Sequence, residues 1–303
     1  MSSMRRSSEA LALSKSDEAL PPLLLAARYG QISELDAQLG AAHKAQWLGV
    51  DELTRQNALH WATRHGQLHA AKRLCAHECA RQWLAMGDAD ANTPLHLAAT
   101  KSRRLTALFL ERGANTNAVN SSGDSPLSIH VLSATKDDPS VTEDLLHHGA
   151  DANWIVRGES VLHEAIDRGL VNIACQLVRF GARLDTKDGH GRMVFDKVTD
   201  KLSQRLFAYI AAPQAWVPDA ERRHCMACVK KFNALLARRH HCRHCGRLCC
   251  AACARAFVHL NTKPQRVCAT CLGVLRGYVS AGGDERPRRA SLVYNQLVAA
   301  PAR

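Results

Sequence analysis

Eight cysteines in the last third of this 303-residue chain are spaced as four Cys-x-x-Cys pairs. The pairs are Cys225/Cys228, Cys242/Cys245, Cys250/Cys253 and Cys268/Cys271. Each pair can direct two thiolates toward one ion, and two pairs complete a tetrahedral four-sulfur zinc site. One such pair would also suit redox chemistry, but four so close together favour metal binding. We therefore expect two Zn²⁺ ions.

The gaps between the pairs predict which of them share an ion. Only four residues separate the second pair from the third, which is too short for those two to share one site comfortably. Pairs one and three are therefore expected on one zinc, and pairs two and four on the other. Cys249 is expected to be a buried non-ligand, because only Cys250 has the two-residue spacing to Cys253. In so small a module, metal binding should supply much of the folding free energy.

A basic run, Arg238-Arg239-His240-His241-Cys242-Arg243, lies at the second ligand pair. Zinc binding alone does not explain it. The 16 basic and 4 acidic residues from Pro213 onward carry the whole net charge of +12, and the preceding part is neutral. This distribution suggests an interaction scaffold joined to a module for anionic surfaces. Nucleic acid is not expected as the ligand, because the basic face lacks interleaved aromatic residues.

The preceding two hundred residues repeat with a period near 33–36 residues, which is typical of ankyrin repeats. Residues able to cap a helix recur at Asn57, Thr93, Ser125 and Ser160, and Pro follows two of them. Gly-Ala pairs recur after the second helix of a repeat and supply its C-terminal stop. This part resembles the ankyrin-repeat family, with about five repeats, a partial C-terminal one, and an insertion after Cys75. The resemblance implies an unidentified protein partner.

Several residues of this part could be taken for metal ligands or catalytic groups, but we expect them to have structural roles. His60, His96 and His163 recur at one motif position and are expected to be structural hydrogen bonders. No Ser-His-Asp or Cys-His arrangement rises above chance, so no catalytic residue is assigned and the chain is not expected to be an enzyme. The tryptophans that could anchor a partner, if they are exposed, are Trp61, Trp83 and Trp154.

Three further motifs surround the zinc ligands: Trp216-Val217-Pro218-Asp219, the basic run, and Arg266-Val267-Cys268. Together they resemble the WxxD, RRHHCR and RVC signatures of the FYVE zinc finger, from Trp216 to about Leu272. The resemblance implies binding of phosphatidylinositol 3-phosphate on endosomal membranes. It also implies roles for individual residues in holding the headgroup.

By that resemblance, three arginines would hold the 3-phosphate, and Arg238 would hold the 1-phosphate. The three are Arg239, Arg243 and Arg266. Guanidinium groups suit this role because they bind phosphate with bidentate geometry. His241 and Asp219 would contact the ring hydroxyls, with His240 and Trp216 beside them. Leu235 and Leu236 stand where family members carry a hydrophobic tip that enters the bilayer, although packing in the small core is an alternative.

The sequence thus predicts an all-α ankyrin solenoid followed by a cross-brace two-zinc FYVE finger with a small α+β fold. The expected parts are a flexible segment (1–19), ankyrin repeats (20–212), the finger (213–275) and a flexible tail (276–303). With neither a signal peptide nor a membrane span in the sequence, we expect a cytoplasmic protein associated peripherally with early endosomes. The expected function is a non-enzymatic adaptor in membrane trafficking. The alternative is a RING-like, zinc-dependent ubiquitin ligase that selects substrates through its ankyrin repeats.

Overall fold

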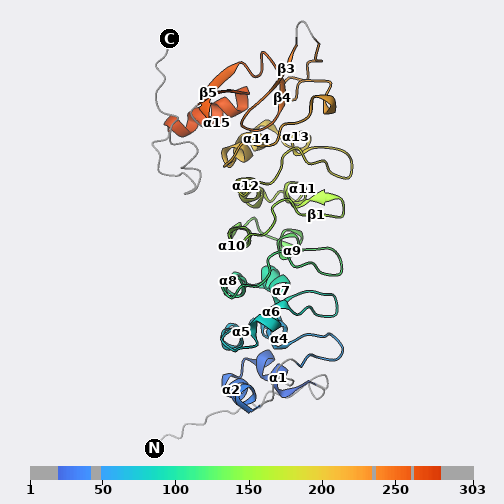
Figure 1. The fold of residues 1–303 in the computed structure, drawn as a ribbon, viewed down its shortest axis with the longest axis vertical. Coiled ribbons are helices and arrows are strands. Elements are labelled where there is room, and N and C mark those ends of the chain that lie inside the picture. The colour runs from blue at the N-terminus through green and yellow to red at the C-terminus, as the bar shows by residue number, and fades with distance from the viewer. Residues whose placement is uncertain (1–19, 42–48, 234–236, 261–262, 281–303) are drawn as a thin grey trace, which may run out of the picture. The chain divides into compact units, whose positions relative to one another are not determined.

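The computed structural model describes residues 20–41, 49–233, 237–260 and 263–280. The chain divides into two compact units, Met1–Ser122 and Gly123–Arg303. Paired short helices build the described part of the first unit and the beginning of the second (Figure 1). The second unit continues into a small finger of strands and one longer helix. Of the segments expected to be flexible, 1–19 and 276–303, residues 1–19 and 281–303 lie outside the described residues, whereas residues 276–280 belong to a helix.

The first helix of each pair begins at a residue that the repeat pattern marks. These helices are α1 (Pro22–Tyr29), α4 (Ala58–Arg64), α7 (Pro94–Lys101), α9 (Pro126–Ser133), α11 (Val161–Asp167) and α13 (Val194–Lys197). Side-chain caps explain where α4 and α9 start. The Asn57 side chain accepts the N–H of His60 at 3.1 Å, and the Ser125 hydroxyl accepts the N–H of Ser128 at 3.2 Å. Each cap satisfies a backbone donor that the first helical turn leaves open.

The second helices pack beside the first and carry much of the apolar surface. They are α2 (Ile32–Ala41), α5 (Leu68–Cys75), α8 (Arg103–Glu111), α10 (Ser140–His147), α12 (Val171–Arg179) and α14 (Asp200–Ala208). Leu74, Phe109, Leu145 and Leu177 on these helices are fully buried. In the first unit, the insertion after Cys75 forms a short helix, α6 (Ala80–Ala85). In the second unit, β1 (Ile155–Val156) and β2 (Glu159–Ser160) form a small antiparallel hairpin before α11.

The repeated histidines are structural, as the sequence predicts. The ring of His60 is buried; its Nδ1 accepts the N–H of Asn57 at 3.3 Å, and its Nε2 lies 2.8 Å from the carbonyl of Asn92. The ring of His96 likewise accepts the N–H of Thr93 at 3.0 Å. Burial lowers the pKa of His60 to about 4, so the ring is neutral at neutral pH. Each ring therefore ties the start of its helix to the preceding residue.

The tryptophans behave differently from the expected partner anchors. Trp83 is fully buried and Trp61 is only 8% exposed, so neither presents its ring to a partner. Trp61 stacks on the ring of His65, and Trp83 stacks on that of His77. Trp154 is half-buried and donates its indole N–H to the carbonyl of Gly123 at 3.1 Å. The rings of Trp61 and Trp83 therefore belong to the core.

The finger contains two antiparallel hairpins and a C-terminal helix. Its elements are η1 (Asp219–Glu221), β3 (Arg239–His241), β4 (Leu248–Cys250), β5 (Ala256–Leu260), β6 (Lys263–Val267) and α15 (Ala269–Ser280). Strand β3 pairs with β4, and β5 pairs with β6. Helix α15 continues to Ser280, so the finger extends past the boundary at 275 that the sequence suggested. Helix α15 packs against α14, and its Leu275 is buried.

No helix within the described ranges is both long enough and apolar enough to cross a membrane.

Candidate metal centres and anion-binding surface

The eight paired cysteines converge into two groups of four. One group is Cys225, Cys228, Cys250 and Cys253, and the other is Cys242, Cys245, Cys268 and Cys271. Within each group all sulfurs lie within 4.8 Å of one another. This is the interleaved grouping that the short gap between the second and third pairs indicates. A tetrahedral site with Zn–S bonds near 2.3 Å has its sulfurs about 3.8 Å apart.

The measured sulfur separations fit that geometry. Cys228 Sγ lies 3.8 Å from Cys250 Sγ, and Cys245 Sγ lies 4.0 Å from Cys268 Sγ. Backbone N–H groups also point at the sulfurs: that of Cys250 donates to Cys225 Sγ at 3.3 Å, and that of Cys268 donates to Cys242 Sγ at 3.2 Å. Such donors stabilise thiolates, the form that binds metal. Each group could therefore hold one zinc ion.

The pKa of the Cys225 thiol shows how the backbone prepares a ligand. Burial by itself would raise this pKa, but the N–H groups of Cys250, Ala227 and Cys228 lower it to about 7. Cys249 is buried and belongs to neither group.

His244 supports the second group and was missed by sequence reasoning. Its ring is buried, burial lowers its pKa to about 4, and its Nδ1 lies 3.3 Å from Cys271 Sγ. A neutral ring in this position can donate Nδ1–H to the thiolate and orient it.

A backbone hydrogen bond brings the end of the basic run next to strand β6. Arg239 and His241 lie on β3, while Arg266 lies on β6. The Arg243 N–H donates to the Arg266 carbonyl at 2.8 Å, which joins the end of the basic run to β6. Burial and the nearby charges of Arg266 and Arg238 lower the pKa of His240. The backbone thus joins the basic run to the strand that carries Arg266, although the two lie far apart in sequence.

Each of the three arginines assigned to the 3-phosphate lies against an aromatic ring. The guanidinium carbon of Arg243 is 3.5 Å from the centre of the Trp216 ring. The corresponding distances are 5.1 Å for Arg239 over Phe232 and 4.7 Å for Arg266 over Phe257. Stacking on a ring leaves the planar edge of a guanidinium able to donate to phosphate.

Sequence reasoning identified only Trp216 among these rings. Phe257 lies directly opposite Arg266 in the β5–β6 register and is 56% exposed. That pairing fixes Arg266 together with a hydrogen bond of 2.7 Å from its Nη1 to the Ala254 carbonyl. Knowing the register beforehand would have revealed Phe257, because cross-strand neighbours share a face.

The WxxD motif reaches the basic run through His241. The rings of Trp216 and His241 stack with centroids 5.3 Å apart. His241 Nε2 lies 2.8 Å from the Val217 carbonyl and 3.3 Å from Asp219 Oδ1. Asp219 and Arg238 are both exposed. Leu235 and Leu236, the expected membrane-inserting pair, lie outside the described residues.

Comparison with known families agrees with this geometry. The family model for the FYVE zinc finger matches residues 215–277, and that for ankyrin repeats (3 copies) matches residues 23–120. A basic finger with two four-cysteine zinc sites, preceded by helical repeats, is the class that the fold and the site define. The chain therefore carries ankyrin repeats followed by a C-terminal FYVE zinc finger. The predicted fold class and the prediction of two zinc sites are confirmed.

Relatives match stretches of the chain that differ in length. Mouse Rabankyrin-5 is 31% identical over 182 residues, which is 56% of this chain and 15% of that protein. Mouse FYVE, RhoGEF and PH domain-containing protein 2 is 45% identical over 86 residues, or 27% of this chain and 13% of that protein. Human early endosome antigen 1 is 44% identical over 69 residues, which is 22% of this chain and 5% of that protein. The chain thus spans only a small part of each of these three relatives.

Proposed function

We propose that this protein is a non-enzymatic adaptor that binds phosphatidylinositol 3-phosphate through its finger and a protein partner through its ankyrin repeats. It would act in membrane trafficking, in the cytoplasm and at the surface of early endosomes. The FYVE match and the similarity to early endosome antigen 1 and Rabankyrin-5 support this proposal. The identity of the ankyrin partner does not follow from it.

The observation that carries the proposal is that each of three arginines lies against an aromatic ring, and that one of these rings, Trp216, also stacks on His241. A phosphomonoester carries nearly two negative charges, and several guanidinium groups can share them through charge-assisted hydrogen bonds. In the proposal, Arg239, Arg243 and Arg266 hold the 3-phosphate, and Arg238 holds the 1-phosphate. Asp219 and His241 contact the ring hydroxyls, since a carboxylate can accept the hydrogen bonds that hydroxyl groups donate.

Membrane attachment has a second component in the proposal. Leu235 and Leu236 enter the bilayer beside the headgroup, where each buried leucine contributes about 1.5–3 kcal/mol. Lys230 and Lys231 are exposed next to this segment and add attraction of about 1 kcal/mol each to anionic lipid.

Sedimentation with liposomes that carry one phosphoinositide at a time tests the proposal. The zinc-loaded protein should pellet with the 3-phosphate lipid and much less with lipids phosphorylated elsewhere. Arg239→Ala should abolish that selectivity. Arg255→Ala is the matched control, because Arg255 is an exposed arginine of the same finger and its loss removes the same charge.

Binding that follows only the total negative charge of the liposomes would contradict the proposal. In that event the RING-like ubiquitin ligase becomes the preferred function. An in vitro ubiquitination assay with the same protein would then test it directly.

A further inference from the structure

The finger rests on the last ankyrin helix pair through a buried arginine. Arg247, which precedes β4, is only 4% exposed. Its guanidinium carbon lies 5.1 Å from the centre of the Phe195 ring and 4.8 Å from that of Phe207. It also donates to the Ser203 hydroxyl at 2.9 Å. Phe195 belongs to α13, and the other two partners belong to α14, so this finger residue is seated entirely in ankyrin helices.

The chain that leads into the finger is packed equally closely. The N–H of Gln214 donates to the His244 carbonyl at 3.2 Å, and that of Val217 donates to the Gly246 carbonyl at 3.0 Å. Gly246 has a φ of +78°, and a Cβ there would lie 2.0 Å from the Ala215 carbonyl oxygen. Helix α15 packs on α14 (Figure 1). The connection between the repeats and the finger is therefore a packed interface, and not a free linker.

Two ion pairs join the last ankyrin loop and the helix α13 that follows it to the segment that carries Asp219. Lys187 pairs with Glu221, and Asp196 pairs with Arg222. Glu221 is the last residue of η1, and Arg222 follows it. Asp219 begins the same short 3₁₀ turn and faces His241 at 3.3 Å. Both pairs thus act within three residues of a side chain assigned to the headgroup.

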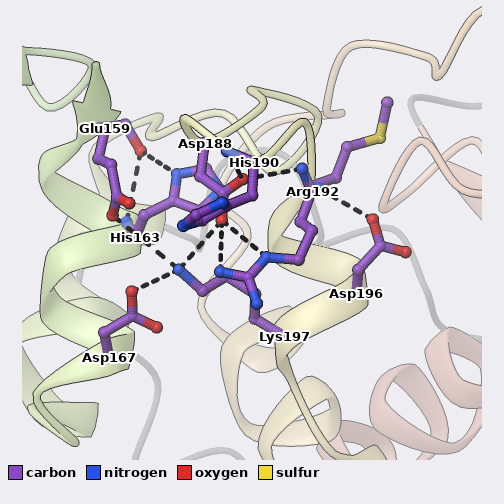
Figure 2. Close-up of polar contacts among 10 residues, drawn as sticks. Glu159, His163, Asp167, Asp188, His190, Arg192, Asp196 and Lys197 are labelled. Carbon is purple, nitrogen blue, oxygen red and sulfur yellow. Dashed lines mark hydrogen bonds and ion pairs between the residues drawn. The ribbon is translucent and has the colours of Figure 1, made fainter.

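A network around the buried Asp188 holds the segment from Lys187 to Lys197, which ends in α13, in place (Figure 2). Asp188 accepts the backbone N–H groups of His190 and Arg192 at 2.9 and 2.8 Å, and the Arg192 Nε at 3.0 Å. Lys197 Nζ lies 3.4 Å from Asp188 and also pairs with Asp167 on α11. Although burial opposes ionisation, these donors hold the pKa of Asp188 well below its usual range. The loop is consequently anchored to the preceding repeat.

We propose that the last ankyrin helix pair is a structural part of the lipid-binding finger, and that Lys187 and Asp196 position the Asp219 segment for the headgroup. The inference rests on the proposed function for its lipid component. The Asp188 network fixes the loop, the loop holds Glu221 and Arg222, and those residues fix the turn that presents Asp219. Lipid binding by the finger therefore depends on its contacts with the last ankyrin helix pair.

A charge reversal with a charge-matched control tests this assignment. In the full zinc-loaded chain, Lys187→Glu breaks the pair with Glu221, and Lys187→Glu with Glu221→Lys restores it in the opposite sense. Arg183→Glu changes the net charge by the same amount in the same region. Its guanidinium pairs with Asp185, an ankyrin residue. Asp196→Asn removes the second pair while retaining an acceptor for the Met193 N–H.

Two measurements read the outcome. The first is the affinity for soluble short-chain phosphatidylinositol 3-phosphate by calorimetry. Lys187→Glu should weaken it up to about fivefold, the value of one exposed ion pair. Asp196→Asn should act in the same direction, the swapped pair should restore affinity, and Arg183→Glu should leave it unchanged. The second is hydrogen exchange of residues 216–224 without lipid. It should accelerate in Lys187→Glu and return to normal in the swapped pair.

Each outcome decides between the two proposals. Equal behaviour of Lys187→Glu and Arg183→Glu in both measurements would overturn the positioning role. If the wild-type chain binds no 3-phosphate lipid, the proposed function fails, and the lipid component of this inference fails with it. The exchange measurement then still decides whether the ankyrin loop fixes the Asp219 segment.

Discussion

The buried neutral ring of His60 makes the stability of the ankyrin repeats depend on pH. In the folded protein Nδ1 accepts the Asn57 N–H, so a proton added there would face another donor. Burial lowers the pKa from 6.5 to about 4. The unfolded chain therefore binds a proton between those values while the folded chain does not. The contribution of the neutral His60 ring to the free energy of unfolding is fully present above pH 6.5 and is lost as the pH falls toward 4.

The size of this effect follows from the two pKa values. The difference of about 2.5 pH units corresponds to about 3 kcal/mol once the pH is below both. Between pH 7.5 and pH 5 the loss amounts to about 2 kcal/mol. Urea unfolding followed by tryptophan fluorescence at the two pH values measures it.

His60→Asn provides the comparison. Its side-chain oxygen can occupy the position of Nδ1 and accept the Asn57 N–H, but it does not titrate. The variant should be less stable at pH 7.5, because the contact with the Asn92 carbonyl is lost. Its further loss on acidification should be smaller than that of the wild type by about 2 kcal/mol. Equal losses in the two proteins would show that His60 is not held neutral by burial.

Three further predictions concern the finger. Removal of zinc by a chelator should unfold the finger and leave most of the helical circular dichroism of the repeats, because metal binding supplies its folding free energy; complete loss of helix would contradict this. Gly246→Ala should lower the unfolding temperature of the zinc-loaded protein, because its φ is +78° and a Cβ would meet the Ala215 carbonyl. Gly273→Ala in α15 has open space and should not; equal shifts would refute the argument. Phe257→Ala should weaken binding of the soluble 3-phosphate headgroup about twofold to fivefold through loss of its contact with Arg266, and unchanged calorimetric affinity would exclude a role for the ring.

Features set by short-range chemistry were predictable from the sequence. The Ser125 cap contacts Ser128, and the His96 ring contacts Thr93. Each contact joins residues three apart in the chain, so the repeat pattern predicts it. The grouping of the cysteines was predictable because a four-residue gap restricts which pairs can meet.

Features that depend on tertiary packing were not predictable in this way. Trp83 is buried by its neighbours, whereas its residue type left open whether it would be a binding anchor or part of the core. The contact of Phe257 with Arg266 depends on the register of β5 and β6, which places the two residues opposite each other. Lys187 and Glu221 are 34 residues apart and belong to different parts of the chain. No local pattern specifies such partners.

Recognition of the 3-phosphate by the ring-backed arginines is tested most directly with Arg266→Ala. The measurement is calorimetric titration of the zinc-loaded protein with soluble short-chain phosphatidylinositol 3-phosphate, which excludes membrane insertion. Loss of one guanidinium–phosphate contact should weaken binding about tenfold to a hundredfold. Arg255→Ala should bind like the wild type. Equal affinities for Arg266→Ala and Arg255→Ala would contradict the assignment of this surface to the headgroup.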